Sequence, residues 1–179
     1  PLTERGRAQA AATAARIAAT WQPRAVYTSP MGRCVATACA IADACGAPSE
    51  ILPGLIDFNY GAWQWRTVEE VRAAWPELLA AWYATPHLVR FPEGDALQDL
   101  VARTANAVRL VLTRHPEDTV VMVGHETANR AILLQLLDQP LSAYWRFAQE
   151  PCAINEIDID GGRVRAHCIN DTSHLSGIA

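Results

Sequence analysis

The sequence has few of the features that mark membrane, secreted or nucleic-acid-binding proteins. None of its apolar runs reaches the roughly 20 residues of a membrane-spanning helix, and the N-terminus lacks the short apolar core of a signal peptide. A block of basic residues is also missing, and the net charge is −4. Nucleic-acid binding depends on clustered basic residues that neutralise phosphates, so we expect neither a nucleic acid nor a membrane as partner. A small anionic substrate stays open, because a few well-placed arginines can bind one phosphate.

Cysteine is scarce and irregularly spaced. The five cysteines are an odd number without C-x-x-C spacing, which argues against a disulfide framework and against a zinc site. Free thiols are typical of a reducing compartment, so the expected location is the cytoplasm. Half of the residues are hydrophobic and 19% are charged, which excludes wholesale disorder. This length and composition predict one compact domain over residues 1–179.

Apolar periodicity predicts helices that alternate with short strands. Helices are expected over residues 3–21, 30–45, 67–75, 76–84, 95–115 and 127–138. Strands are expected at 25–28 and 119–124, and a hairpin is expected at 154–169. The strand at 119–124 is a continuous apolar run, typical of a strand that is buried on both faces. This alternation predicts an α/β fold, a three-layer sandwich in which helices flank a mostly parallel sheet.

Polar side chains follow both of the predicted parallel strands. The first strand leads into Ser29 and then Arg33, and the second leads into His125. Ligands bind outside the carboxyl ends of the strands in open α/β sheets, so this edge indicates a site. Arg33 lies in the opening turn of a helix, where its guanidinium can fork onto two phosphate oxygens, although a surface arginine explains the position equally well. For His125, the strand-end position favours function over a buried structural role.

Further candidates lie beside His125 and in an aromatic-rich loop over residues 50–66, called the aromatic loop below. Asp57 is close in sequence to Trp and Tyr residues, where a carboxyl group can act as a proton donor; an aspartate that caps local backbone is an equal alternative. Trp63 and Trp65 can wall a substrate pocket, although most of the six tryptophans should pack in the core. Glu126 follows His125 directly and is a further candidate for the pocket.

Five segments, in the same order, resemble the histidine phosphatase superfamily with its phosphoglycerate-mutase-like fold. They are residues 2–6 (LTERG), 27–38 (YTSPMGRCVATA), 55–63 (LIDFNYGAW), 94–96 (GDA) and 120–130 (VVMVGHETANR). The match spans nearly the whole chain. Each motif is weak alone, but five in this order and spacing are a strong indication.

This resemblance implies hydrolysis of a small phosphate monoester through a phosphohistidine intermediate. His125 would bind and polarise the phosphoryl group, Arg33 would hold its equatorial oxygens, and Asp57 would protonate the leaving oxygen and then activate water. Such chemistry needs positioning, charge stabilisation and a proton donor, so neither a metal nor a cofactor is implied. A cofactor-dependent phosphoglycerate mutase is the alternative enzyme, disfavoured because the stretch from Trp63 to Gly94 is short. A non-catalytic phosphate-binding or interaction domain is the alternative from another class.

The sequence departs from the family pattern at three places. Asp57 stands where glutamate is commoner, and Gln64 and Trp65 replace a usual Glu-Gly pair after Trp63. The Arg-His-Gly motif that carries the family's nucleophilic histidine matches nothing in the 179 residues. The resemblance therefore implies that the first, interior strand is absent from these residues and that the chain alone is inactive. From typical βα lengths, we expect about 25–30 upstream residues to be absent from the sequence.

An absent interior strand would leave unpaired backbone groups and exposed apolar faces. If the chain folds alone, we expect a homodimer or a swapped element to cover the gap, and a fully paired sheet in a monomer would contradict this. The substrate stays open among sugar phosphates, a cobalamin-precursor phosphate and phosphoglycerates. A pocket at Trp63 and Trp65 would favour an apolar or planar leaving group.

Overall fold

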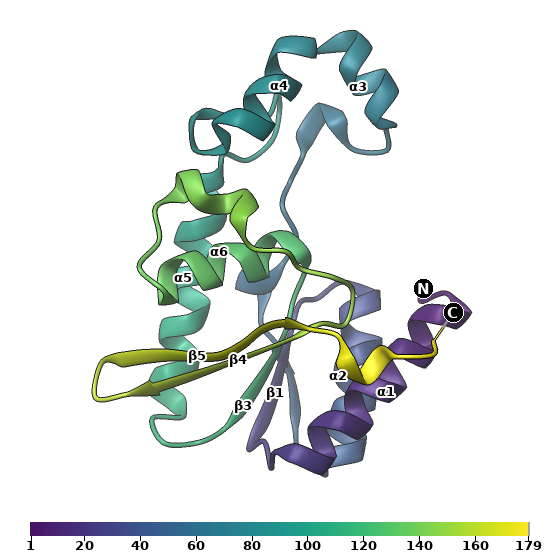
Figure 1. Cartoon of the computed structure of the whole chain (residues 1–179), viewed down its shortest axis with the longest axis vertical. Coiled ribbons are helices and arrows are strands. Elements are labelled where there is room, and N and C mark those ends of the chain that lie inside the picture. The colour runs from purple at the N-terminus through teal and green to yellow at the C-terminus, as the bar shows by residue number, and fades with distance from the viewer. Residues whose placement is uncertain (179) are drawn as a thin grey trace.

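A parallel sheet of three short strands forms the centre of the structure, a computed structural model that describes residues 1–178 (Figure 1). The strands are β1 (Ala25–Thr28), β2 (Ser49–Ile51) and β3 (Val120–Val123), in the order β2-β1-β3. β1 lies between the other two, with Tyr27 opposite Glu50 of β2 and Met122 of β3. Parallel strands require crossover connections, and helices provide most of their length here.

Helices cover both faces of this sheet. α1 (Glu4–Thr20) and α2 (Gly32–Cys45) lie on one face, and α5 (Leu97–Arg114) lies on the other. Successive residues of a strand point to opposite faces, so Val26 shares a buried cluster with Ile17 and Ile41, whereas Tyr27 shares one with Val111. The expected α/β architecture, a parallel sheet flanked by helices, is confirmed.

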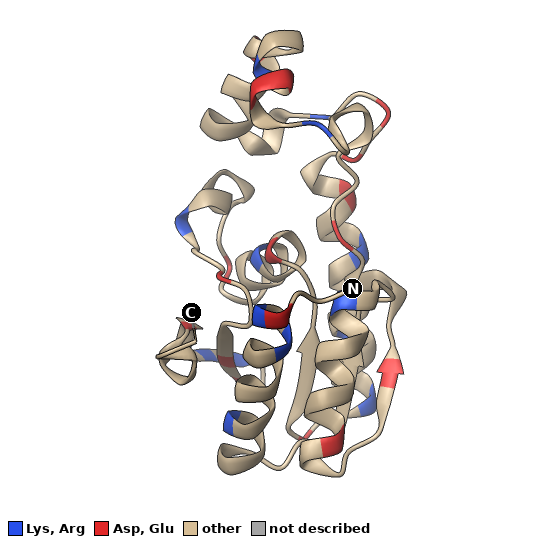
Figure 2. Ribbon diagram, turned by 90° about the vertical axis from the view of Figure 1, so that its right-hand side faces the viewer, with Lys and Arg blue, Asp and Glu red and all other residues tan. Residues whose placement is uncertain are grey.

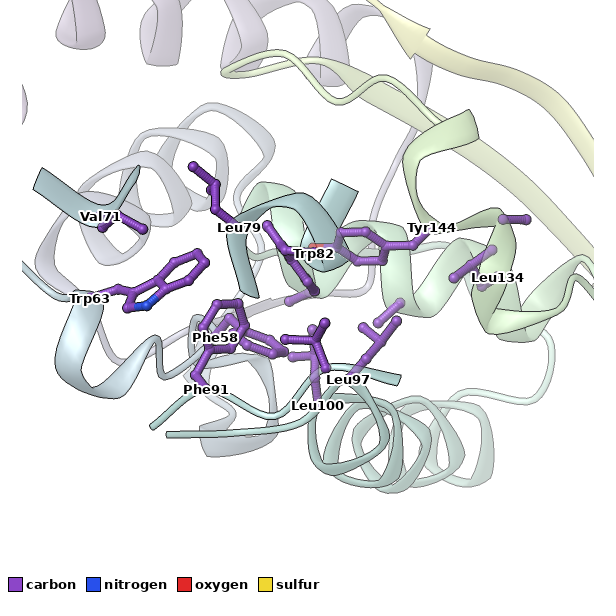
Figure 3. Packing of buried hydrophobic residues seen from close by; sticks show 14 residues of the cluster. Phe58, Trp63, Val71, Leu79, Trp82, Phe91, Leu97, Leu100, Leu134 and Tyr144 are labelled. Atoms are coloured by element: carbon purple, nitrogen blue, oxygen red, sulfur yellow. The ribbon is translucent and has the colours of Figure 1, made fainter. Parts of the chain in front are cut away.

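A helical lobe lies above the sheet in Figure 1. It consists of α3 (Val68–Ala74) and α4 (Pro76–Ala84), with α6 (Glu126–Leu136) and a 3₁₀ segment over Leu141–Arg146 beneath it. A capping box starts α3, because the Thr67 hydroxyl accepts from Glu70 N and the Glu70 carboxylate accepts from Thr67 N. One buried aromatic cluster joins the lobe to the body (Figure 3), and it includes Phe58, Trp63, Trp82, Phe91 and Tyr144.

An antiparallel hairpin follows the 3₁₀ segment. β4 (Ile154–Asp160) pairs with β5 (Arg163–Asp171), as predicted, and Ile154 packs against the same cluster as Val121 and Val123 of β3. The residues after β5 fold back onto α1, where His174 Nε2 lies 3.0 Å from Thr13 Oγ1. The segment after β5 therefore packs on the first helix of the chain.

β3 differs from its prediction because it lies at an open edge of the sheet. Its residues are half-buried, so the expectation of a strand buried on both faces is wrong. Among residues 1–178, its only hydrogen-bonded neighbour is β1, and β4 pairs only with β5. The second edge of β3 is therefore unpaired, which explains the partial exposure and agrees with the expectation of an incompletely paired sheet.

Two helix starts also differ from the predictions. α2 begins at Gly32 rather than at 30. α5 begins at Leu97 with Ala96 as its N-cap, whereas Asp95 was the predicted N-cap. The Asp95 carboxylate instead accepts from Asn59 N (3.2 Å) and pairs with Arg103 (3.5 Å). Asp95 thus ties the aromatic loop to α5 instead of capping the helix.

Charged residues are interspersed over the ribbon in Figure 2 rather than gathered in long blocks of one sign. No helix within residues 1–178 has the length and apolarity to cross a membrane. No disulfide bond joins any two of the five cysteines. In the part of the chain that the structure describes, no three His, Cys, Asp or Glu side chains gather in the manner of metal ligands.

Candidate active site

The carboxyl ends of β1 and β3 bring Ser29 and His125 together. β1 continues into Ser29 and then α2, and β3 continues through Gly124 into His125, the N-cap of α6. Because the two strands are adjacent and parallel, both connections leave the same edge of the sheet. The Ser29 hydroxyl lies 2.8 Å from His125 Nε2, and both residues are buried. The carboxyl edge of the sheet therefore brings together residues that follow the two strands, at the place where the sequence predicted a site.

Arg33 and Asp57 meet at the other nitrogen of the His125 ring. Arg33 Nη2 lies 2.7 Å from Asp57 Oδ2 and 2.8 Å from His125 Nδ1, and Asp57 Oδ2 is 3.4 Å from Nδ1. A guanidinium only donates hydrogen bonds, so Nδ1 accepts here and the ring proton lies on Nε2, which donates to Ser29. The three residues that the sequence singled out for phosphoryl chemistry thus contact one another.

Contacts from its own loop, from α6 and from α5 fix Asp57, two of them at the carboxylate and the rest at the backbone. Its Oδ1 accepts from Phe58 N (2.9 Å) and from the Thr127 hydroxyl (2.7 Å), which belongs to the first turn of α6. Arg103 of α5 donates to Asp57 O (2.8 Å) and to Ile56 O, so the backbone of the loop is held as well. Asp57 can therefore keep one orientation while Arg33 turns towards a ligand.

Burial controls the protonation of the atoms around His125. Burial lowers the pKa of His125, and although Asp57 opposes this, Arg33 and Arg103 add to it. The ring is therefore neutral near pH 7 in the absence of a ligand. Beneath it, Cys34 Sγ donates to Gly124 O at 3.2 Å and lies 3.5 Å from Nε2. Burial raises the pKa of this thiol to about 11, so Cys34 stays protonated.

The site is open on one side. The Arg33 side chain is 46% exposed and that of Asp57 is 28% exposed, whereas that of His125 is only 4% exposed. An anion that approaches from solvent therefore meets the guanidinium and carboxylate first, with the imidazole behind them. Arg33 offers paired N–H donors suited to two phosphate oxygens, and Asp57 offers a carboxyl group for proton transfer.

A cleft of about 880 Å³ begins at Asp57 and extends under the helical lobe. Its wall is mainly aromatic and includes Phe58, Tyr60, Trp63, Trp65, Trp82, Tyr83 and Trp145. Trp63 is buried and packs edge-on against Phe91, at a ring separation of 4.7 Å, whereas Trp65 is fully exposed. Both tryptophans therefore lie at the cleft, but only Trp65 has its ring in solvent.

Glu126 takes a different place from the one expected for a pocket residue. Its carboxylate pairs with Arg130, four residues later in α6, and it does not line the cleft within the described residues. Arg130 is buried, donates to Phe147 O (2.6 Å) and lies over the Trp145 ring. Arg130 therefore acts as a structural residue that fixes the segment behind α6.

The other histidines lie away from this cluster. His115 bonds to Tyr27 and Asp118, His167 to Asp158, and His174 to Thr13. His87 lies in the 3₁₀ turn after α4. Within residues 1–178, no second imidazole is hydrogen-bonded to the cluster of Arg33, Asp57 and His125.

Three contacts of the site were not assigned a role from the sequence. Ser29 and Thr127 lie inside the motifs around Arg33 and His125, so the sequence placed them near the site. It did not indicate that Ser29 would contact His125 Nε2 or that Thr127 would donate to Asp57. Arg103 gave no signal, because it lies within an amphipathic helix, 46 residues after the carbonyl that it holds.

Comparison with known proteins identifies the family. The model of the "Histidine phosphatase superfamily (branch 1)" matches residues 1–172. "Phosphoserine phosphatase 1" of Hydrogenobacter thermophilus is 32% identical over 97% of this chain and 82% of its own length. The "Metal-independent phosphoserine phosphatase" of Arabidopsis thaliana is 27% identical over 99% of this chain and 74% of its own. The solved structure of Bacillus stearothermophilus YhfR, 28% identical, superposes with a TM-score of 0.91 over 98% of this chain and 87% of that one. The chain belongs to the histidine phosphatase superfamily.

Proposed function

We propose that the protein hydrolyses phosphate monoesters through a phosphohistidine intermediate. The observation that supports this most directly is the meeting of Arg33, Asp57 and His125 at the carboxyl edge of the sheet, with contacts of 2.7, 2.8 and 3.4 Å. Asp57 also lines a cleft that is large enough for a small phosphate ester. The names of the two relatives, both phosphoserine phosphatases, point to the same class of reaction.

The contacts suggest how the three residues divide the work. An arriving phosphate competes with Asp57 for Arg33, whose guanidinium then forks onto two phosphoryl oxygens. Once Arg33 has turned away, His125 Nδ1 can donate to a third oxygen, because Ser29 can reverse its hydrogen bond with Nε2 and donate to it. Asp57 stays in place through Phe58 and Thr127 and faces the leaving group.

The reaction then proceeds in two balanced steps. In the first, a nucleophilic histidine attacks phosphorus, so that a P–N bond forms while the P–O bond to the leaving group breaks. Asp57, which takes up a proton when Arg33 leaves it for the phosphate, donates that proton to the leaving oxygen in this step. In the second, Asp57 takes a proton from water, and the water oxygen bonds to phosphorus while the P–N bond breaks. The histidine is restored and inorganic phosphate is released. Arg33 and His125 stabilise the charge on the phosphoryl oxygens in both steps.

We place the nucleophile on residues outside this chain that add a strand to the open edge of β3. A parallel strand in that position would end at the same edge of the sheet as β3, beside His125. It would also cover the half-exposed valines and Met122, whose partial burial is otherwise unfavourable. Both relatives extend beyond the region that this chain matches, which covers 82% and 74% of their lengths. A second copy of the chain could instead cover β3, in a homodimer.

The proposed setting is a reducing compartment, the cytoplasm, where the five unpaired cysteines would remain thiols. The proposed partner is a small phosphate ester. Arg33 and the buried imidazole provide the positive and polar groups that its phosphoryl oxygens need, so the chemistry requires no metal.

Phosphate release in EDTA tests the proposal. The substrate is an aryl phosphate, and the proteins are this chain and a version that carries its natural upstream residues. We expect release only from the extended protein, and we expect His125→Ala to lower kcat by about 10²–10³-fold, the usual cost of losing a group that stabilises transition-state charge. Leu88→Ala, an exposed position that does not line the cleft, is the matched control.

Other outcomes point to other functions. Transfer of phosphate between glycerate positions, primed by bisphosphoglycerate, would favour the mutase. An extended protein that is folded and binds phosphate but releases none from any ester would contradict the proposal and favour a non-catalytic binding domain.

A further inference from the structure

Trp65 has an unfavourable backbone conformation and an unfavourable environment. Its φ is +65°, in the left-handed region that L-residues other than Gly, Asn and Asp rarely adopt. Its side chain is 101% exposed, so the indole packs against nothing in the fold. Glycine would adopt such a φ without strain. Folding therefore does not explain the tryptophan, and a strained residue of this kind points to a function.

The position of Trp65 suggests what that function is. It lies at the cleft that begins at Asp57, together with Trp63, Trp82, Tyr83 and Trp145. The buried rings of this wall are fixed by one another, as Figure 3 shows for Trp63 and Trp82 beside Phe58 and Phe91. A flat apolar group that enters the cleft thus meets a rigid aromatic wall, and the indole of Trp65 gains the packing that it lacks in the free protein.

The charges of the cleft argue against a leaving group that carries a carboxylate. Four lining residues are charged, and two of these are the acids Asp57 and Asp95. Arg103 is engaged with Asp95 and with two backbone carbonyls. Arg66 donates to Ala62 O (2.9 Å), and its guanidinium lies 5.3 Å from the centre of the Trp75 ring. A carboxylate in this cleft would lose water and face Asp57 and Asp95, whose cationic partners Arg33 and Arg103 are already paired with them. Arg66 would then be its remaining positive neighbour in the cleft wall, through N–H groups that the contact with Ala62 O leaves free.

We propose that the cleft binds the leaving group of the phosphate ester, that this group is uncharged and aromatic, and that Trp65 is the residue that selects it. The inference rests on the proposed phosphatase function, because Asp57 must face both the phosphoryl group and the leaving group. It also separates this protein from its relatives named for phosphoserine, whose leaving group carries a carboxylate and an ammonium group.

A pair of matched substrates tests the selection. 2-Phenylethyl phosphate and O-phosphoserine both release a primary alkoxide, so a difference in kcat/KM reports on the cleft rather than on the P–O bond. The proteins are the extended enzyme, its Trp65→Gly variant and Leu88→Ala as control. We expect the parent to prefer 2-phenylethyl phosphate, and Trp65→Gly to reduce the preference about tenfold through KM, the value of one aromatic stacking contact. Leu88→Ala should keep the preference.

Thermal unfolding of the same variants separates a ligand contact from a structural one. Glycine relieves the positive φ at position 65, so the Tm of Trp65→Gly should equal or exceed that of the parent. A Tm lower by several degrees, or an unchanged substrate preference, would overturn the inference. A preference for phosphoserine that is lost in Arg66→Ala would overturn it too, because Arg66 would then bind the carboxylate.

Calorimetry with an unreactive ligand keeps the inference testable if the proposed function fails. If no ester is hydrolysed, benzylphosphonate is titrated into the parent and into Trp65→Gly. A Kd about tenfold weaker in the variant supports the aromatic cleft without any catalysis. Equal affinities, or no binding to either protein, contradict it.

Discussion

The two ring nitrogens of His125 contact Ser29 and Arg33, which differ in their ability to donate and accept hydrogen bonds. Ser29 can donate or accept, whereas Arg33 can only donate. The free protein therefore fixes the proton on Nε2, and a bound phosphate can draw it to Nδ1 without moving the ring. A buried hydroxyl at this position gives the imidazole two useful states in one orientation.

The depressed pKa of His125 makes stability depend on pH. Its ordinary pKa is 6.5, and burial lowers it in the folded protein. Above pH 6.5 the ring is neutral in both the folded and unfolded states, so it adds no pH dependence there. Below that pH the unfolded chain binds the proton first, and the free energy of unfolding falls until the folded pKa is passed.

We therefore expect the free energy of unfolding to fall more steeply for the parent than for His125→Gln between about pH 6.5 and pH 5, in urea titrations. Other titrating groups are common to both proteins and cancel in the comparison. Equal slopes for the two proteins would show that His125 is not buried in its neutral form.

Removal of the Ser29 hydroxyl should leave the His125 ring without its hydrogen-bond partner at Nε2. In Ser29→Ala, Nε2 loses its partner, so the extended enzyme should lose about 10–100-fold in kcat while KM changes less. The acid limb of the pH–rate profile should move as well, because the group that titrates has lost a hydrogen bond. Ser49→Ala, at an exposed position in β2, is the control. A loss confined to stability would assign Ser29 a purely structural role.

At the level of elements, the aromatic loop meets the turn before α5 with almost no space between them. Gly61 has a φ of +53°, and a Cβ there would lie 2.6 Å from Gly94 N and closer still to Pro92 O. This contact holds the loop that carries Asp57, which explains why a glycine follows the carboxylate four residues later. Gly162, in the turn of the hairpin, has a φ of +81° but only open space around its Cβ position.

The two glycines form a matched pair. Gly61→Ala should destabilise the protein by about 2–4 kcal/mol, since it adds a backbone clash to the strain of a positive φ. Gly162→Ala should cost only about 1 kcal/mol, because it adds the strain alone. Chemical denaturation of both variants gives the difference, and similar losses would indicate that the loop can move away from Pro92.

At the scale of the whole molecule, the sheet and the hairpin are separate units in the described residues. Thr119 O and Val123 O accept from Arg24 N and Ser29 N, the residues on either side of β1. The alternation along a strand therefore turns the backbone groups of Val120 and Met122 towards the open edge. These outward amides report directly on whether another strand is present.

We expect the amides of Val120 and Met122 to exchange quickly with solvent in this chain and slowly in the version with its upstream residues. The amides of Val121 and Val123 face β1 and serve as internal controls, with protection in both proteins. Hydrogen exchange followed by NMR distinguishes the two sets. Strong protection of Val120 in the short chain, at a concentration where it is monomeric, would contradict an open edge.

Most of the architecture was predictable from the sequence because it depends on local patterns. The apolar runs, the prolines and the hairpin turn predicted the helices and four of the strands to within a few residues, but the short strand β2 was not predicted. The burial of β3 was not predictable, because it depends on what lies beside the strand rather than on the strand itself. The start of α5 was missed for a similar reason, since the Asp95 carboxylate bonds to Asn59 N and to the Arg103 side chain instead of to the free backbone N–H groups at the start of the helix.

The site was predictable where its residues follow strands and not where they reach it from a distance. Arg33 and His125 follow adjacent strands, so their meeting could be expected. The contact between Arg103 and the backbone of the Asp57 loop spans 46 residues and depends on the packing of α5, which the sequence pattern does not encode. The positive φ of Trp65 was not predictable either, because the residue type alone does not determine its backbone angle.

The fluorescence of Trp65 should also report whether a ligand occupies the cleft. Its indole is fully exposed, while Trp63 and Trp82 are 8% and 3% exposed. The red edge of the intrinsic fluorescence, where emission from water-exposed indoles dominates, should therefore come largely from this one residue. Acrylamide should quench that edge first, and an aromatic ligand in the cleft should shield it and shift the emission to the blue.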